Sequence, residues 1–180
     1  SACATCDGFF YKDKKVMVVG GGNTAVEEAL FLTNFASEVI LVHRRDELRA
    51  EKILQNKLFN HPKISTIWDS EVIEIIGQDN PPSVNSVLLK NVKNNVEEKI
   101  MVDGIFIAIG HSPSSSIFKG KLEINNNGYI ITEPDSTLTS VEGVFAAGDG
   151  TDERYRKAVT ADGMGSMDAL EAENYLSSKE

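Results

Sequence analysis

The fold of this chain is decided by residues 14–30, which read KKVMVVGGGNTAVEEAL. The first six residues are mostly β-branched or apolar, which is typical of a strand buried on both faces. The run then passes through three consecutive glycines into a segment whose apolar residues recur at helical spacing. The stretch therefore predicts a buried strand, a tight turn and a helix, in that order.

The elements predicted on either side extend this unit into an α/β domain. We expect strands at 15–19, 38–42 and 64–68, with helices at 23–35 and 46–59 between them. This β-α-β-α-β order is that of a parallel, Rossmann-like nucleotide-binding sheet. Three short antiparallel strands follow at 71–77, 84–92 and 97–102, and a last buried strand at 104–109 ends at Gly110. We predict a three-layer nucleotide-binding domain with a β-meander.

The remainder of the chain is less regular. The segment 111–116 (HSPSSS) interrupts the pattern and is the candidate hinge. Strands are expected at 129–132 and 144–147, and a final helix at 159–176. These strands are too few to close a core alone, so we interpret the tail as the returning part of a second domain.

The glycine turn itself fits the pattern G-x-G-x-x-A over residues 20–25. Gly20 would make the turn and Gly22 would let the backbone approach a pyrophosphate. Ala25 would permit close packing of helix and strand. Because the motif lies between a strand and a helix, dinucleotide binding is favoured over a purely structural turn.

A basic cluster follows the second strand, where sites that prefer NAD usually place a carboxylate. The cluster consists of Arg44 and Arg45, with Arg49 expected on the same helical face as Arg45. Guanidinium groups suit a 2′-phosphate, so the cluster favours NADPH. The alternative is a solvated basic turn paired with its own acidic neighbours, namely Asp46, Glu47 and Glu51.

The only two cysteines, Cys3 and Cys6, form a C-x-x-C pair followed directly by Asp7. This spacing allows a disulfide and suits thiol–disulfide exchange, for which Asp7 could transfer the proton. A zinc site would need further ligands, and the histidines are scattered, so no metal site is predicted. An inert buried pair is the other alternative.

The bulk composition excludes some classes of partner. The formal net charge is −9, with 41% hydrophobic and 25% charged residues. This acidity argues against a nucleic-acid or anionic-membrane surface. No stretch approaches the roughly 20 apolar residues of a membrane span, and no signal-peptide pattern is present. We expect a soluble, cytoplasmic protein.

Five stretches together resemble the bacterial-type (low molecular weight) thioredoxin reductases. They are residues 3–10 (CATCDGFF), 20–30 (GGGNTAVEEAL), 43–50 (HRRDELRA), 108–113 (AIGHSP) and 144–149 (VFAAGD). The resemblance covers residues 1–176 and corresponds to the C-terminal portion of that family. It implies an NADPH-binding domain at 1–112, and at 113–180 the C-terminal part of an FAD-binding Rossmann-like domain. It also implies that the first part of the FAD domain is absent from this chain.

The resemblance assigns roles to individual residues. Cys3 would exchange with thioredoxin, Cys6 would face the flavin and Asp7 would be the acid–base. Phe9 and Phe10 match positions that help to dock thioredoxin, with a plain core role as the alternative. The cofactor contacts it implies are Gly20, Gly22, Asn23, Thr24, Ala25, His43, Arg44, Arg45, Arg49 and Gly110 for NADPH, and Gly148, Asp149, Arg156, Lys157 and Ala158 for FAD.

The implied activity passes electrons from NADPH through FAD and the cysteine pair to thioredoxin, in a homodimer that rotates its domains about the hinge. Lys157 departs from the glutamine usual in the family. Without the rest of the FAD domain, we expect the chain alone to be inactive. The alternatives are the reductase component of a peroxiredoxin system and a non-catalytic NADPH-binding module. Related ferredoxin–NADP reductases lack the cysteine pair.

Overall fold

The computed structural model describes residues 1–179, which fall into two compact units, the first Ser1–Gly110 and the second beginning at His111. The first unit contains a parallel sheet whose strands lie in the order β3-β2-β1-β7. These strands are β1 (Lys15–Val19), β2 (Glu38–Val42), β3 (Ile64–Ile67) and β7 (Gly104–Ile107). The central strand β1 pairs in parallel with β2 on one side and with β7 on the other.

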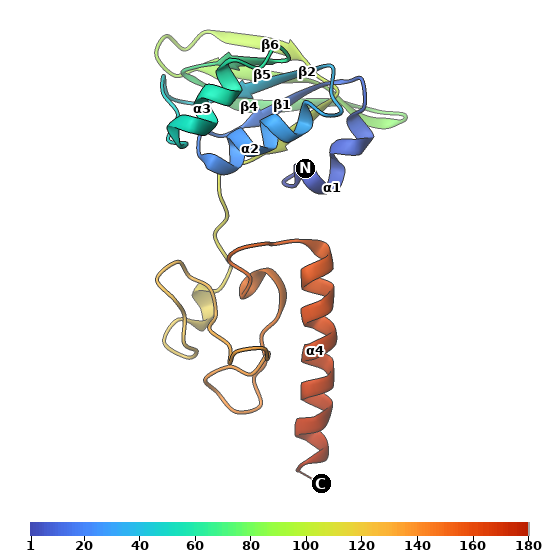
Figure 1. The fold of residues 1–180 in the computed structure, drawn as a ribbon, viewed down its shortest axis with the longest axis vertical. Coiled ribbons are helices and arrows are strands. Elements are labelled where there is room, and N and C mark those ends of the chain that lie inside the picture. The colour runs from blue at the N-terminus through green and yellow to red at the C-terminus, as the bar shows by residue number, and fades with distance from the viewer. Residues whose placement is uncertain (180) are drawn as a thin grey trace. The chain divides into compact units, whose positions relative to one another are not determined.

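Alternate residues of β1 enter two separate cores, and this places the sheet in the middle of three layers. Val16 and Val18 belong to one buried cluster, which also contains the apolar side of helix α2 (Asn23–Leu32). Met17, between them, belongs to a second cluster shared with Val87 of the antiparallel meander. Figure 1 shows α2 and helix α3 (Lys52–Phe59) together on one face of the sheet. The predicted three-layer α/β fold is confirmed.

The third layer is the antiparallel sheet β4-β5-β6. Its strands are β4 (Ser70–Asp79), β5 (Pro82–Asn91) and β6 (Glu97–Met101), close to the ranges expected from the sequence. Ser86 on β5 is fully buried, as are the apolar residues that β5 contributes to the second core. The meander therefore covers the face of the parallel sheet opposite the helices.

The helix expected at 46–59 begins only at Lys52, so that prediction was wrong for its first turn and a half. Residues 44–51 form a non-helical segment, the arginine loop. Its backbone finds partners outside any helix: the Arg49 N–H donates to the Gly21 carbonyl at 2.7 Å. The Glu51 N–H donates to the side-chain oxygen of Asn23 at 2.9 Å. Arg45 and Arg49 therefore do not share a helical face.

Helix α2 is also shorter than the helix expected at 23–35, because it ends at Leu32. The chain tightens into a turn there, where the Thr33 N–H and hydroxyl both donate to the carbonyl of Leu30. Short helical segments precede β1, namely α1 (Ala4–Asp7) and the 3-10 helix η1 (Gly8–Tyr11). Ala4 of α1 is fully buried against the helix layer.

The second unit contains the long helix α4 (Ala158–Ser177) and two 3-10 turns, η2 (Ser116–Phe118) and η3 (Gly148–Gly150). The strands expected at 129–132 and 144–147 are present only as isolated bridges, such as Ile124 with Ile130 and Leu138 with Phe145. Pairing at single positions does not make a strand, so this prediction was wrong. The predicted helix is confirmed. No described helix is both long and apolar enough to cross a membrane.

Substitution of Phe106, on β7, tests the buried cluster between the parallel sheet and the helices. Its ring is fully buried and lies edge-to-face with Tyr11 at 5.3 Å between centroids. Phe106→Ala should lower the free energy of unfolding of the first unit by about 3–5 kcal/mol, because it leaves a cavity. Denaturant titration followed by Trp68 fluorescence measures this, since Trp68 is the only tryptophan and lies in that unit.

The matched control is Ile53→Ala on α3, whose side chain is 63% exposed. It should change the free energy by no more than about 0.5 kcal/mol. Equal effects of the two substitutions would contradict the assignment of the core.

Candidate functional site

The first cluster of functional residues is the cysteine pair, which the structure shows as a disulfide between Cys3 and Cys6. Cys3 is the N-cap of α1, and its sulfur accepts a hydrogen bond from the Cys6 N–H at 3.2 Å. Cys3 is half-buried and Cys6 is exposed. An accessible disulfide can be attacked by a thiolate, which an inert buried pair cannot. The geometry therefore favours redox exchange at this position.

The short helix that carries the disulfide is attached to the rest of the first unit at several points. The Ala4 N–H donates to a carboxylate oxygen of Glu28, on α2, at 3.3 Å. The Ile107 N–H donates to the carbonyl of Ser1 at 2.8 Å, next to the end of β7. Asp7 is half-buried at the end of α1, and its N–H bonds the carbonyl of Cys3 at 3.1 Å. The disulfide thus sits on an ordered support.

Two aromatic side chains lie on the surface just after the disulfide. Phe9 is 68% exposed and Phe10 is 70% exposed, with their rings edge-to-face at 6.3 Å. Phe9 also packs against Phe35. Such exposure does not suit a plain core role, because large apolar groups gain stability from burial.

The second cluster is the glycine turn between β1 and α2. Gly20 has φ +156°, and a Cβ there would lie 2.7 Å from the Cβ of Ala25 and would collide with the carbonyl oxygen of Ala108. A Cβ on Gly21 would fall within the imidazole ring of His43. Around Gly22, by contrast, the corresponding space is open. The turn is closed toward the protein and open where α2 begins, as a phosphate-binding turn requires.

The residues of the glycine turn that were predicted to bind the dinucleotide differ in their exposure to solvent. Asn23 and Thr24 are exposed at the start of α2, and Ala25 is buried beneath them. The amide of Asn23 is engaged with Glu51 through both its oxygen and its nitrogen. Asn23 therefore has a structural partner that the sequence pattern did not indicate, whereas the first backbone N–H groups of an α-helix such as α2 have no partner within the helix.

A cleft of about 510 Å³ joins this turn to the arginine loop. Gly20, Gly21, His43, Arg44 and Arg49 line it together with Ile107 and Ile109. Arg45 is exposed and is not among the lining residues. Of the ten residues predicted as NADPH contacts, the cleft brings together four, namely Gly20, His43, Arg44 and Arg49, and it leaves Arg45 outside.

One wall of the cleft was missed by the sequence analysis. It consists of Ser70, Glu71 and Val72, at the start of the meander strand β4. These residues carry no local motif, and only the packing of the meander under the parallel sheet brings them to the site.

His43 connects the turn to the arginines. Its side chain is buried, and its Nε2 has no hydrogen-bond partner among the described residues. Burial of the ring lowers the pKa of His43 below its ordinary 6.5, and the guanidinium charges of Arg49, Arg45 and Arg44 act in the same direction. The imidazole is therefore neutral near pH 7, and its unpartnered Nε2 is a buried polar atom of a residue that lines the cleft. These features, with the open glycine turn and two arginines, fit a phosphorylated dinucleotide.

The lowered pKa of His43 is measurable. Because the folded-state pKa lies below the unfolded value, the unfolded chain binds more protons between the two, and His43 reduces stability as pH falls through that window. In the ligand-free chain, an NMR titration of the imidazole should show a midpoint below 6.5. The spectrum of His43→Gln assigns the resonance, and a midpoint at or above 6.5 would contradict the burial argument.

The third cluster lies in the second unit. Asp149 of η3, Tyr129 and Arg156 line a hollow of about 390 Å³ with residues of the 111–115 segment. Gly148 has φ +71°, and Arg156 has φ +49°. The Arg156 side chain donates to the Tyr129 hydroxyl at 3.2 Å. Asp149 and Arg156, both predicted as flavin contacts, are therefore brought together.

The residues next to Arg156 are fixed by one carboxylate. Asp152 accepts hydrogen bonds from the backbone N–H groups of Arg154, Tyr155 and Arg156 at 2.7–3.0 Å. Lys157 is the N-cap of α4 and Ala158 its first residue, and neither lines the hollow. Gly110, with φ +100°, lines neither this hollow nor the dinucleotide cleft. The hollow offers a carboxylate and a guanidinium, which suit polar parts of a flavin cofactor.

Comparison with known proteins agrees with this combination of a glycine turn and an exposed disulfide. The model of the pyridine nucleotide-disulphide oxidoreductase family matches residues 1–165, and the chain belongs to this family. Within it, the chain is 57% identical over 176 residues to a thioredoxin reductase of Rickettsia felis, covering 98% of this chain and 57% of that protein. It is 52% identical over 185 residues to a thioredoxin reductase of Coxiella burnetii, covering 99% and 57%.

Solved structures show the same likeness. The chain is similar to the thioredoxin reductase of Streptococcus pyogenes, with a TM-score of 0.86, 44% identity, and coverage of 99% of this chain and 57% of that one. For the thioredoxin reductase of Giardia duodenalis the TM-score is 0.78, the identity 43% and the coverage 98% and 57%. The chain thus spans 57% of the length of these relatives.

Proposed function

We propose that this chain takes part in the NADPH-dependent reduction of thioredoxin by a flavoprotein. The observation that carries the proposal is the exposed Cys3–Cys6 disulfide on the same compact unit as the arginine-lined dinucleotide cleft. The likeness to thioredoxin reductases supports it. In this proposal NADPH supplies a hydride and FAD relays the electron pair to the disulfide.

The cysteine pair would carry the electrons onward by exchange. Reduction of the disulfide yields two thiols, of which Cys3, deprotonated, attacks one sulfur of the thioredoxin disulfide. Cys6 then attacks Cys3, so that the Cys3–Cys6 bond re-forms and thioredoxin leaves as a dithiol. Asp7, next to Cys6, would hold and return the proton in these steps. Phe9 and Phe10 would provide the apolar contact for thioredoxin.

We assign NADPH to the cleft of the first unit. Gly20, Gly22 and Ala25 would shape the turn, and the N–H groups at Asn23 and Thr24 would receive the pyrophosphate. His43, Arg44 and Arg49 would contact the 2′-phosphate. Arg45, outside the lining, would contribute through its charge alone.

We assign FAD to the second unit, where Asp149 and Arg156 line the hollow, with Gly148, Lys157, Ala158 and Gly110 as further contacts carried over from the resemblance. Residues 1–112 would then form the NADPH-binding domain and 113–180 part of the FAD-binding domain. The segment 111–116 would be a hinge between them. We further infer a cytoplasmic homodimer, as the resemblance implies.

The cofactor assignment predicts unequal roles for the arginines. Arg44→Gln and Arg49→Gln should each weaken NADP⁺ binding by about tenfold, the value of a charge-assisted hydrogen bond. Arg45→Gln, the matched control on the same loop, should weaken it less. NAD⁺ binding should be unchanged in all three variants, because NAD⁺ lacks the 2′-phosphate. Isothermal titration calorimetry measures these constants, and equal losses for both dinucleotides would count against a 2′-phosphate site.

The exchange step can be tested on this chain without flavin. A reduced Cys6→Ser chain should form a mixed disulfide with oxidised thioredoxin through Cys3, because the resolving thiol is missing. Mass spectrometry should detect the adduct, and the matched Cys3→Ser variant should give much less of it. An adduct formed mainly through Cys6 would reverse the assigned roles, and no adduct in either variant would contradict exchange with thioredoxin.

A further inference from the structure

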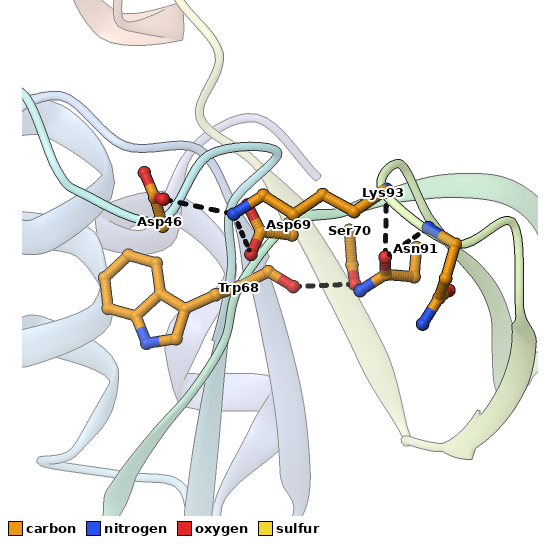
Figure 2. A network of polar contacts seen from close by, with 7 residues as sticks. Asp46, Trp68, Asp69, Ser70, Asn91 and Lys93 are labelled. Atoms are coloured by element: carbon orange, nitrogen blue, oxygen red, sulfur yellow. Dashed lines mark hydrogen bonds and ion pairs between the residues drawn. The ribbon is translucent and has the colours of Figure 1, made fainter.

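A single lysine joins two carboxylates beside the arginine loop. The ammonium group of Lys93 lies 3.1 Å from a carboxylate oxygen of Asp46 and 2.9 Å from one of Asp69. Figure 2 shows the ammonium group between the two acidic side chains. Lys93 is separated from Asp46 by 47 positions in the sequence, and it belongs to the meander rather than to the dinucleotide-binding half.

The turn that presents Lys93 is ordered by its own side chains. The side-chain oxygen of Asn91 accepts hydrogen bonds from the N–H groups of Lys93 and Asn94 at 3.0 and 3.1 Å (Figure 2). The Val92 N–H donates to the carbonyl of Asp69 at 2.7 Å. These backbone contacts therefore hold Lys93 next to Asp69 independently of the contacts that its side chain makes.

The arginine loop does not need Lys93 to hold its position. At one end, the carbonyl of His43 accepts from the Ser70 N–H at 3.1 Å and that of Arg45 from the Asp69 N–H at 3.3 Å. At the other end, Arg49 is bonded to Gly21 through its backbone. Asp46 lies between these anchors with a side chain that is 71% exposed. The contribution of Lys93 is therefore electrostatic rather than one of positioning.

The two carboxylates would otherwise oppose a phosphate ligand. Asp46 directly follows Arg44 and Arg45 in the sequence, so its carboxylate adds a negative charge to the loop that would bind the phosphate. That charge repels a phosphate dianion over the screening distance of about 8–10 Å. Because the chain has a net charge of −9, acidic residues outnumber the basic residues that could attract a phosphate. A lysine paired with both carboxylates offsets part of their repulsion of a phosphate.

We propose that Lys93 is a specificity-determining residue for the 2′-phosphate: it neutralises Asp46 and Asp69 and so reduces their repulsion of a phosphate bound by Arg44 and Arg49. The inference deepens the proposed NADPH site and rests on it. It requires no contact between Lys93 and the dinucleotide. The meander would thereby contribute to the choice between NADPH and NADH, through the positive charge of Lys93, which lies outside the dinucleotide-binding motif.

The test compares NADP⁺ and NAD⁺ binding by calorimetry in the 180-residue chain and four variants. Lys93→Met should weaken NADP⁺ binding about two- to fivefold, the range that exposed ion pairs sustain, and should leave NAD⁺ unchanged. Lys93→Arg should bind as the unsubstituted chain does. Lys99→Met removes the same charge from an exposed position on β6 and should have a smaller effect. The loss caused by Lys93→Met should shrink at high salt.

The decisive variant is the double substitution Lys93→Met/Asp46→Asn. If Lys93 acts by neutralising Asp46, removal of that carboxylate should restore most of the lost NADP⁺ affinity. A double variant as weak as Lys93→Met, or equal losses for both dinucleotides, would overturn the proposal. An unsubstituted chain that binds NADP⁺ no better than NAD⁺ would overturn the proposed cofactor itself, before any variant is considered.

Discussion

The structure depends on the close approach of Gly20 to its neighbours at the end of β1. A side chain there would meet the carbonyl oxygen of Ala108 and the methyl group of Ala25, so only glycine lets β1, β7 and α2 converge at this point. That convergence places the glycine turn, the end of β7 and His43 around one cleft. It also brings the end of β7 beside Ser1, two residues before the disulfide. Ile107 thus lines the dinucleotide cleft and also bonds the segment that carries the disulfide.

The first unit combines two kinds of chemistry on one scaffold. The cleft has a neutral, buried imidazole and exposed guanidinium groups, which favour an anionic ligand without burying an unpaired charge. The disulfide sits on a short helix bonded to α2 through Glu28. Helix α2 begins at the glycine turn and also contacts the short helix that carries the disulfide. The cleft and the disulfide are therefore connected through this one helix.

The sequence predicted the elements whose local pattern agrees with their final environment. The run 15–30 has a continuous apolar stretch, a glycine turn and a helix period in immediate succession, and turn-forming segments separate the meander strands. Residues 46–51 of the arginine loop were wrongly predicted as helix, because they favour helix locally while Gly21 and Asn23 supply competing partners. Glu71 and Lys93 could not be found at all, since they reach the site through pairing across long stretches of chain. In the second unit, short β-like runs pair only at single positions.

The central claim is that the cleft between the glycine turn and the arginine loop selects a 2′-phosphorylated dinucleotide. A crystal structure of the chain with NADP⁺ tests this most directly. The account predicts the pyrophosphate at the N–H groups that begin α2, and the 2′-phosphate within hydrogen-bond distance of Arg44 and Arg49, with His43 Nε2 satisfied by the ligand. A dinucleotide bound elsewhere, or a 2′-phosphate that points to solvent away from both arginines, would contradict it.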